Sequence, residues 1–286
     1  MLWRDGKVIE GRQTLLDHAD RGLTLGDGLF DTALALGGRV AFEEAHIARL
    51  VAAAGVLGIP ADAAVVRSAM RDLAERGPRL VLRTTLTRGT GARGLKPPDA
   101  PNPTLFATAI PSGRSIAFAP LRLLPTAIAR NDTSPAAGIK AIGYLDAILA
   151  ARDAAAAGFD EALFSNTKGR IACAGTGNVF CVTGAPDAPT LVTPPLSDGV
   201  LPGIVRAQLL ALAPACGLAV EERSLTPGDL NGAQAVFVTN SLRLLAPVTA
   251  IGGTDYDSAA HPAFLRLQDA LRGAVAASCR VAIEEV

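Results

Sequence analysis

The sequence has little of what several kinds of functional site require. It contains three histidines and four cysteines, none at metal-ligand spacing, so we expect no metal site. The formal net charge is +0, and nucleic acid is not an expected partner because no basic field exists to hold it. The N-terminus lacks an apolar signal core, and the most apolar run, residues 50–66, is broken by Pro60 and Asp62. These absences predict a cytoplasmic protein with reduced thiols and no membrane segment.

Lysine is also scarce, since only four occur in 286 residues. Lys7, Lys96 and Lys168 stand in polar surroundings next to glycine or proline, which indicates surface turns. Lys140 stands among apolar residues, where we expect the start of an Ala- and Leu-rich helix. An amine there loses solvation and becomes a usable nucleophile toward a carbonyl group. The alternative is a helix-start lysine whose amine reaches back to solvent.

The hydrophobic pattern predicts a mixed α/β chain. Hydrophobic residues make up 49% of it and the mean hydropathy is +0.31, which favours a well-buried globular protein. Strands are expected at residues 29–36, 80–87, 104–109, 116–121, 161–165, 170–173, 179–182, 218–222, 235–239 and 244–251. Helices are expected at 43–56, 61–76, from Lys140 to about 157, and at 262–276. We predict a small N-terminal lobe at 1–115, a linker at 116–130 and a larger barrel-like lobe at 131–286.

Two segments have the composition of an anion site. The loop from Arg88 to Gly94 contains two arginines among glycines, which suits a carboxylate, although a solvated turn is the alternative. Gly203 and Ile204 fall in the first turn of a predicted helix, where backbone N–H groups are available to a phosphate.

Seven motifs follow one another from residue 21 to residue 248. They are Arg21-Gly22 with Gly26–Phe30, His46–Leu50, Arg88-Gly89 with Arg93-Gly94, Gly138–Lys140, Gly175–Phe180, Leu201–Arg206, and Thr239–Ser241 with Pro247-Val248. In these motifs and in their order the chain resembles the class IV (fold type IV) pyridoxal-phosphate enzymes. This family includes D-amino-acid aminotransferases, branched-chain aminotransferases and 4-amino-4-deoxychorismate lyases.

The resemblance implies an α/β enzyme of two lobes with pyridoxal 5'-phosphate between them. Lys140 would form the internal aldimine and then move a proton between the substrate and the cofactor. The other cofactor-binding residues implied are Arg49, Tyr144, Cys173, Ile204, Val205, Asn240 and Ser241, with Arg49, Ile204, Val205, Asn240 and Ser241 around the phosphate. The substrate side would be lined by Phe30, Arg88 and Arg93.

One residue departs from the family pattern in a way that bears on the chemistry. The family usually has a glutamate five residues before Asn178, and its carboxylate keeps the pyridine nitrogen of the cofactor protonated. Cys173 occupies that position, and its small or apolar neighbours Ile171, Ala172 and Ala174 predict a neutral thiol. A neutral thiol cannot hold a proton on that nitrogen, so we expect a weaker electron sink.

The function that the resemblance implies is an aminotransferase, which moves an amino group between an amino acid and a 2-oxo acid. The alternative is a 4-amino-4-deoxychorismate lyase, which eliminates pyruvate to give 4-aminobenzoate. A second alternative is a non-catalytic relative, in which Cys173 marks the loss of turnover. Because family members are homodimers whose sites borrow a loop from the partner, we expect a homodimer.

Overall fold

The computed structural model describes residues 1–11 and 13–286, which form two compact units. The first unit comprises Met1–Gly113, Ile139–Gly143 and Val275–Val286, and the second comprises Arg114–Gly138 and Tyr144–Ala274. Each unit is therefore assembled from segments that are separated in the sequence. None of the helices in the described residues combines the length and the apolar character needed to cross a membrane.

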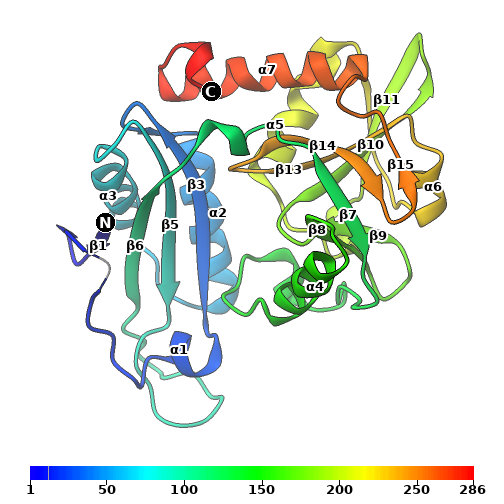
Figure 1. The fold of residues 1–286 in the computed structure, drawn as a ribbon. Helices are drawn as coiled ribbons and strands as arrows, with labels where there is room; N and C mark the ends of the chain where they lie inside the picture. Colours follow the sequence, from blue (N-terminus) through cyan, green and yellow to red (C-terminus); the bar gives the residue numbers. More distant parts are fainter. Residues whose placement is uncertain (12) are drawn as a thin grey trace. The chain divides into compact units, whose positions relative to one another are not determined.

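The first unit contains an antiparallel six-stranded sheet with the strand order β2-β1-β6-β5-β3-β4 (Figure 1). Its strands are β1 (Leu2–Arg4), β2 (Lys7–Ile9), β3 (Gly28–Leu36), β4 (Arg39–Val40), β5 (Arg79–Thr87) and β6 (Thr104–Pro111). Its helices are α1 (Arg21–Leu25), α2 (Glu43–Leu57) and α3 (Ala63–Ala74). Helix α2 packs on β3, and α3 packs on β5 and β6, so the two helices cover one face of the sheet.

Side chains alternate between the two faces of this sheet. On β3, Leu29 and Ala33 lie in the apolar core beneath the helices, together with Leu50 of α2 and Leu73 of α3. Phe30 has the opposite parity and therefore lies on the face that α2 and α3 leave uncovered.

The second unit is built on a nine-stranded sheet, part of which closes on itself. Its strands are β7 (Leu121–Pro125), β8 (Glu161–Ser165), β9 (Ile171–Ala174), β10 (Asn178–Ala185), β11 (Ala188–Thr193), β12 (Ala219–Glu222), β13 (Ala235–Asn240), β14 (Leu244–Ile251) and β15 (Thr254–Asp255). Because β9 pairs with both β8 and β10, the strands β10-β13-β14-β7-β8-β9 form a closed ring, a small barrel.

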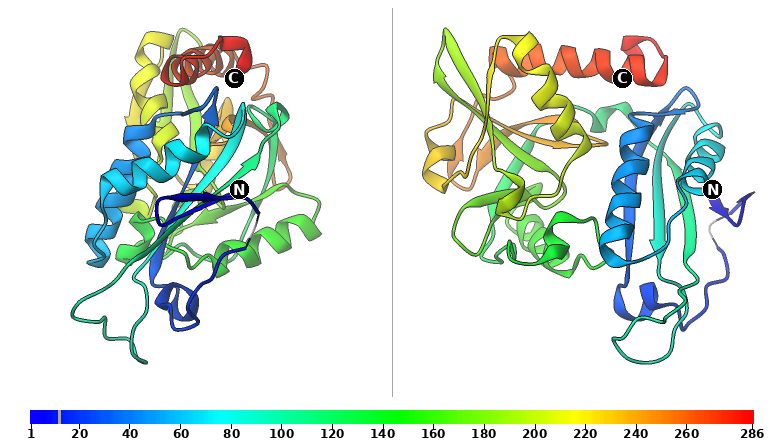
Figure 2. Two further views of the ribbon diagram at one scale, coloured as in Figure 1. Left: turned by 90° about the vertical axis from the view of Figure 1, so that its left-hand side faces the viewer. Right: turned by 180° about the vertical axis from the view of Figure 1, so that it is seen from behind.

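Four α-helices lie between or after the strands of the second unit in the sequence. They are α4 (Leu145–Ala156), α5 (Ile204–Leu212), α6 (Pro227–Asn231) and α7 (Pro262–Cys279), and α7 belongs to the first unit from Val275 onward. Helix α5 packs against β13, as the rear view in Figure 2 shows. Short 3₁₀ turns occur at Arg114–Ile116, Pro135–Gly138, Leu196–Asp198, Pro214–Cys216 and Ile283–Glu285.

The barrel strands also separate two sets of side chains. Ala174, Val179 and Val238 belong to the apolar core inside the barrel. Cys173 and Asn178 alternate with them and therefore point outward. The outer face of the barrel, rather than its interior, thus presents the polar side chains of these strands.

Two local predictions from the sequence are wrong. The strand expected at residues 116–121 begins at Leu121 instead, because Phe118 adopts a left-handed φ of 60° and Pro120 has no N–H to donate. Lys140 was expected at the start of a helix, whereas α4 begins at Leu145 and Lys140 lies in an extended segment before it.

Candidate active site

The segment that carries Lys140 is attached to the edge of β3. The N–H of Phe30 donates to the carbonyl of Lys140 at 2.9 Å, and the N–H of Ile142 donates to the carbonyl of Gly28 at 3.1 Å. Leu29 and Ala141 form the antiparallel bridge between these two bonds. The segment therefore joins the sheet through a single β-bridge, and backbone pairing, not a helix, fixes the position of the lysine.

This pairing decides on which face of the sheet the Lys140 side chain lies. Lys140 and Phe30 are on the same face, and the Lys140 Nζ lies 4.4 Å from the centroid of the Phe30 ring. The guanidinium carbon of Arg83 lies 3.6 Å from the same centroid. Arg83 is exposed, while Phe30 is 6% exposed. An amine, an aromatic wall and a second cation are thus gathered on the face that α2 and α3 leave uncovered.

The opposite face of β3 carries a buried cluster of charged groups next to Phe30. Asp31 is 1% exposed, and one of its carboxylate oxygens lies 2.5 Å from the Nδ1 of His46. The other oxygen accepts a hydrogen bond from the Nε of Arg49 at 2.9 Å and forms an ion pair with its Nη2 at 2.7 Å. Burial alone would raise the pKa of Asp31, but His46 and Arg49 outweigh it and hold the pKa below its ordinary value. Arg49, the predicted phosphate ligand, is therefore fixed by a buried carboxylate.

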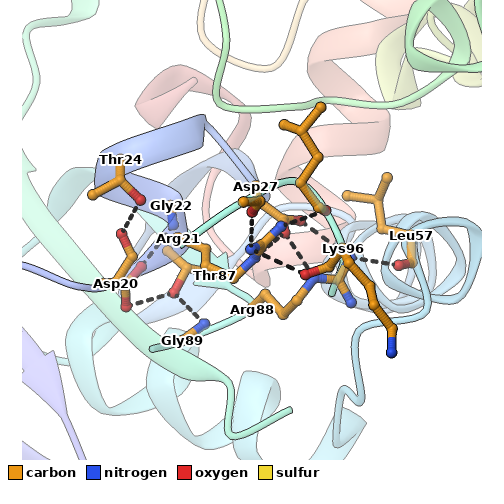
Figure 3. A network of polar contacts seen from close by, with 12 residues as sticks. Asp20, Arg21, Gly22, Thr24, Asp27, Leu57, Thr87, Arg88, Gly89 and Lys96 are labelled. Carbon is orange, nitrogen blue, oxygen red and sulfur yellow. Dashed lines mark hydrogen bonds and ion pairs between the residues drawn. The ribbon is translucent and has the colours of Figure 1, made fainter. Parts of the chain in front are cut away.

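Arg88, which the resemblance assigns to the substrate side, makes buried contacts within the first unit. Its Nε and Nη2 donate to Asp27 at 2.7 and 3.1 Å (Figure 3). Its remaining recorded bonds go to the carbonyls of Leu57 and Gly58, at 2.7 and 3.0 Å, where α2 ends. Because Arg88 is only 5% exposed, these contacts give it a structural task at the end of α2. Arg93 is exposed in the loop that follows.

In the second unit, Cys173 belongs to a row of three outward-facing residues. Cys173 pairs with Asn178, and Asn178 pairs with Thr239 on the next strand. Cys173 also packs against an apolar cluster that includes Phe164 and Ala154. Burial raises the pKa of the Cys173 thiol to about 11, which means that the thiol is neutral at ordinary pH.

The middle residue of this row contacts the start of helix α5. The Asn178 side chain donates to the carbonyl of Leu201 at 2.9 Å. A Cβ on Gly203 would lie 1.9 Å from the Asn178 Oδ1, so only glycine fits at the N-cap of α5. No side chain in the described residues caps this helix, whose first turn contains the predicted ligands Ile204 and Val205.

Thr239 is the third residue of the row, and its hydroxyl has no hydrogen-bond partner among the described residues. The side chain is 1% exposed. A buried hydroxyl without a partner costs free energy, and such groups mark places where a ligand supplies the missing bond. A row of three residues with polar side-chain atoms therefore lies on the outer face of the barrel, and its middle residue contacts the segment before α5.

The turn that follows Thr239 is held by a hydrogen-bonded chain. Asn240 Oδ1 accepts from the N–H groups of Leu242 and Arg243 at 2.9 and 2.8 Å, and its Nδ2 donates to Thr176 Oγ1 at 3.2 Å. The backbone N–H of Thr176 donates to the buried carboxyl group of Glu161. Asn240 thus shapes the turn through its side chain, and Ser241 lies half-buried at the tip of the turn.

Sequence reasoning left out three residues of these clusters. Asp31, Arg83 and Glu161 were not singled out. For Asp31 and Arg83, the alternation of side chains along the predicted strands was the only feature of the sequence that indicated which face of the sheet they occupy. Tyr144 is half-buried and stands immediately before α4, at its N-cap.

Comparison with known proteins identifies the class to which these clusters belong. A family model for amino-transferase class IV matches residues 28–251, so the chain belongs to this family. It is an enzyme of the class, a transaminase or a lyase, with the mixed α/β architecture of fold type IV.

Its relatives include both activities. A protein of Methanocaldococcus jannaschii, named as a putative branched-chain-amino-acid aminotransferase, is 32% identical over 262 residues, with 88% of each chain covered. The bifunctional aminodeoxychorismate lyase / D-amino acid transaminase of Mycobacterium tuberculosis is 26% identical, over 87% of this chain and 90% of that one. The crystal structure of 4-amino-4-deoxychorismate lyase from Pseudomonas aeruginosa matches with a TM-score of 0.84 and 29% identity, over 96% of this chain and 98% of that one.

Proposed function

We propose that the protein uses pyridoxal 5'-phosphate, held through Lys140, to move an amino group between an amino acid and a 2-oxo acid. The observation that carries the proposal is the placement of Lys140 by the β3 pairing, beside Phe30 and Arg83, in a chain of this family. The cofactor would supply an electron-withdrawing ring that stabilises negative charge at the substrate α-carbon.

The residues present fit a phosphorylated ring compound. A phosphate is a dianion, and the first turn of α5 has backbone N–H groups to donate and no side-chain cap among the described residues. The buried Thr239 hydroxyl lies on the same outer face, and Ile204, Val205, Asn240 and Ser241 are the other expected contacts. In the first unit, Arg49 supplies a cation whose orientation Asp31 fixes.

The chain's own residues have separate tasks in this proposal. The Lys140 amine would hold the cofactor and would carry a proton to or from the substrate α-carbon. Arg83 binds a substrate carboxylate, and Phe30 forms the aromatic surface against which Arg83 and Lys140 lie. We keep Arg93 as a second substrate-side residue. Cys173 and Tyr144 are proposed to lie against the cofactor ring, and the neutral thiol leaves its nitrogen without a charged partner.

A second candidate activity is elimination of pyruvate from 4-amino-4-deoxychorismate. The similarity to the P. aeruginosa lyase and to the bifunctional M. tuberculosis enzyme supports it. Both reactions begin with removal of the α-proton, so Lys140 would serve either one. The comparison that separates them is the rate of 4-aminobenzoate release against the rate of amino transfer from D- and L-amino acids.

We also propose that the active form is a homodimer. Three leucines around α1 are exposed although they are apolar: Leu23 at 63%, Leu25 at 46% and Leu95 at 83%. Exposed apolar side chains in one place favour a protein interface. Light scattering after gel filtration tests this proposal, and a monomer at micromolar concentration would contradict it.

The cofactor proposal is tested by visible absorption after pyridoxal phosphate is added to the purified protein. We expect a yellow band, and after borohydride reduction we expect the cofactor mass on the peptide that contains Lys140. Lys140→Ala should lose both, whereas Lys168→Ala, which changes an exposed lysine, should retain both. A wild type without the band would overturn the proposed function.

A further inference from the structure

Arg21 reaches from helix α1 into the loop between β5 and β6 (Figure 3). Its guanidinium binds three successive backbone carbonyls: Gly94 at 2.9 Å, Leu95 at 3.0 Å and Lys96 at 3.5 Å. A single side chain thus holds the middle of the loop by its backbone. This contact does not depend on which side chains the loop carries.

The guanidinium of Arg21 is itself held in place. Its Nε donates to Asp27 at 2.8 Å, and the same carboxylate accepts from Arg88, which is anchored at the end of α2. Burial alone would raise the pKa of Asp27, but the bonds from Arg88 and Arg21 hold the pKa below its ordinary value. Asp27 therefore remains a carboxylate at neutral pH and ties the loop contact to the core of the first unit.

The middle of the loop is exposed and rich in glycine. Residues 92–97 are exposed, and three glycines, Gly89, Gly91 and Gly94, give the backbone additional freedom. Ordering each residue costs about 1–2 kcal/mol of backbone entropy, and exposed side chains do not offset it. A Cβ on Gly91 would lie 2.9 Å from the Arg21 Cδ, so the arginine stem also packs directly on the loop.

We propose that Arg21 is a positioning residue, which orders the loop 89–103 and thereby presents Arg93 to the substrate. The inference depends on the proposed function, because it takes Arg93 to be a substrate-side residue. Arg93 is adjacent to the first clamped carbonyl, and its guanidinium has no ion pair within the described part of the chain. The clamp restricts the positions that Arg93 can occupy, so a substrate carboxylate meets a pre-oriented cation.

Limited trypsin digestion of the cofactor-loaded protein tests the ordering directly. Lys96 precedes Pro97 and is not a trypsin site, so Arg93 is the cleavage point inside the exposed part of the loop. Arg21→Lys keeps the charge but cannot bind three carbonyls and Asp27 at once. We expect cleavage after Arg93 to become at least about tenfold faster, because local opening becomes easier. Cleavage at the wild-type rate would overturn the proposal.

Kinetics test the link to the substrate. Arg21→Lys should raise KM for the amino acid by about tenfold while kcat changes little, as expected for lost binding alone. Arg93→Gln should raise KM similarly, and adding Arg21→Lys to it should have almost no further effect, because both act through one group. Additive effects of the two changes on KM would refute the link to Arg93.

Two controls separate this inference from the proposed function. Arg67→Lys, at a half-buried arginine paired with Glu44, should alter neither cleavage after Arg93 nor KM. Cofactor affinity and thermal unfolding of Arg21→Lys should match the wild type, which excludes general misfolding. If the wild type binds no cofactor, the proposed function fails, and the digestion result alone then decides whether Arg21 orders the loop.

Discussion

Arg49 and Asp31 are joined at a single carboxylate oxygen by a hydrogen bond of 2.9 Å and an ion-pair contact of 2.7 Å, and Asp31 is 1% exposed. The pair fixes the direction of the arginine that we assign to the cofactor phosphate. His46 occupies the second oxygen, so the carboxylate is satisfied on both sides.

Replacing Asp31 by asparagine should therefore be costly. Breaking a buried ion pair on one side usually costs about 3–5 kcal/mol, and we expect Asp31→Asn to lower the free energy of unfolding by about 3 kcal/mol. Cofactor affinity should fall as well, because Arg49 loses the group that orients it. Urea unfolding and titration with pyridoxal phosphate measure the two effects. Glu44→Gln, in an exposed pair, is the control and should leave both unchanged.

The glycine at the start of α5 leads to a steric prediction. In Gly203→Ala the new Cβ would meet the Asn178 Oδ1 at 1.9 Å, so either the helix start or the asparagine must move. We expect a loss of about 1–3 kcal/mol in stability together with weaker binding of pyridoxal phosphate. Gly228→Ala is the matched control, because its Cβ would meet nothing closer than 3.6 Å. Equal cofactor affinities in the two variants would contradict the role of the α5 start.

The burial of Glu161 leads us to expect that the free energy of unfolding depends on pH. Burial raises its pKa above the ordinary value of 4.5, so the folded protein holds this proton more tightly than the unfolded chain. The resulting stabilisation is complete below pH 4.5 and is lost as the pH rises through the folded value. Relative to Glu161→Gln, the wild type should lose about 1.4 kcal/mol per pH unit within that window. Urea unfolding of both proteins at several pH values measures this, and parallel profiles would argue against a raised pKa.

Cys173 gives a prediction about turnover. Cys173→Glu should increase kcat, because a carboxylate at this place would keep the cofactor nitrogen protonated and strengthen the electron sink. Cys173→Ser, which adds no charge, should leave kcat close to the wild type. Steady-state kinetics and the cofactor absorption band measure the effect, and thermal unfolding reports whether the apolar surroundings tolerate the glutamate. An unchanged kcat in folded Cys173→Glu would contradict the position assigned to Cys173.

Short-range patterns in the sequence were reliable where the cause is local. The Thr226-Pro227-Gly228-Asp229 start of α6 forms the capping box that its residue types favour. The strand at residues 80–87 and the helix at 43–56 also agree with β5 and α2, because their hydrophobic periodicity reflects a sheet with one helix-covered face.

Long-range pairing is what the sequence could not reveal. No local pattern assigns residues 139–143 to the first unit, since their partner is β3, more than a hundred positions away. The bonds of Arg88 to Asp27 and to the end of α2 likewise depend on contacts that only folding creates. The clusters around Asp31 and Glu161 were missed for the same reason.

The backbone pairing between β3 and the segment that carries Lys140 also protects the protein against aggregation. It occupies backbone donors and acceptors of β3 that would otherwise form an unprotected sheet edge, and open edges recruit other chains into aggregates. Changes that loosen residues 139–142 would therefore do more than displace the reactive amine. Such variants would lose activity and would also precipitate during expression. The amount of each variant in the soluble fraction should therefore be measured before its activity is interpreted.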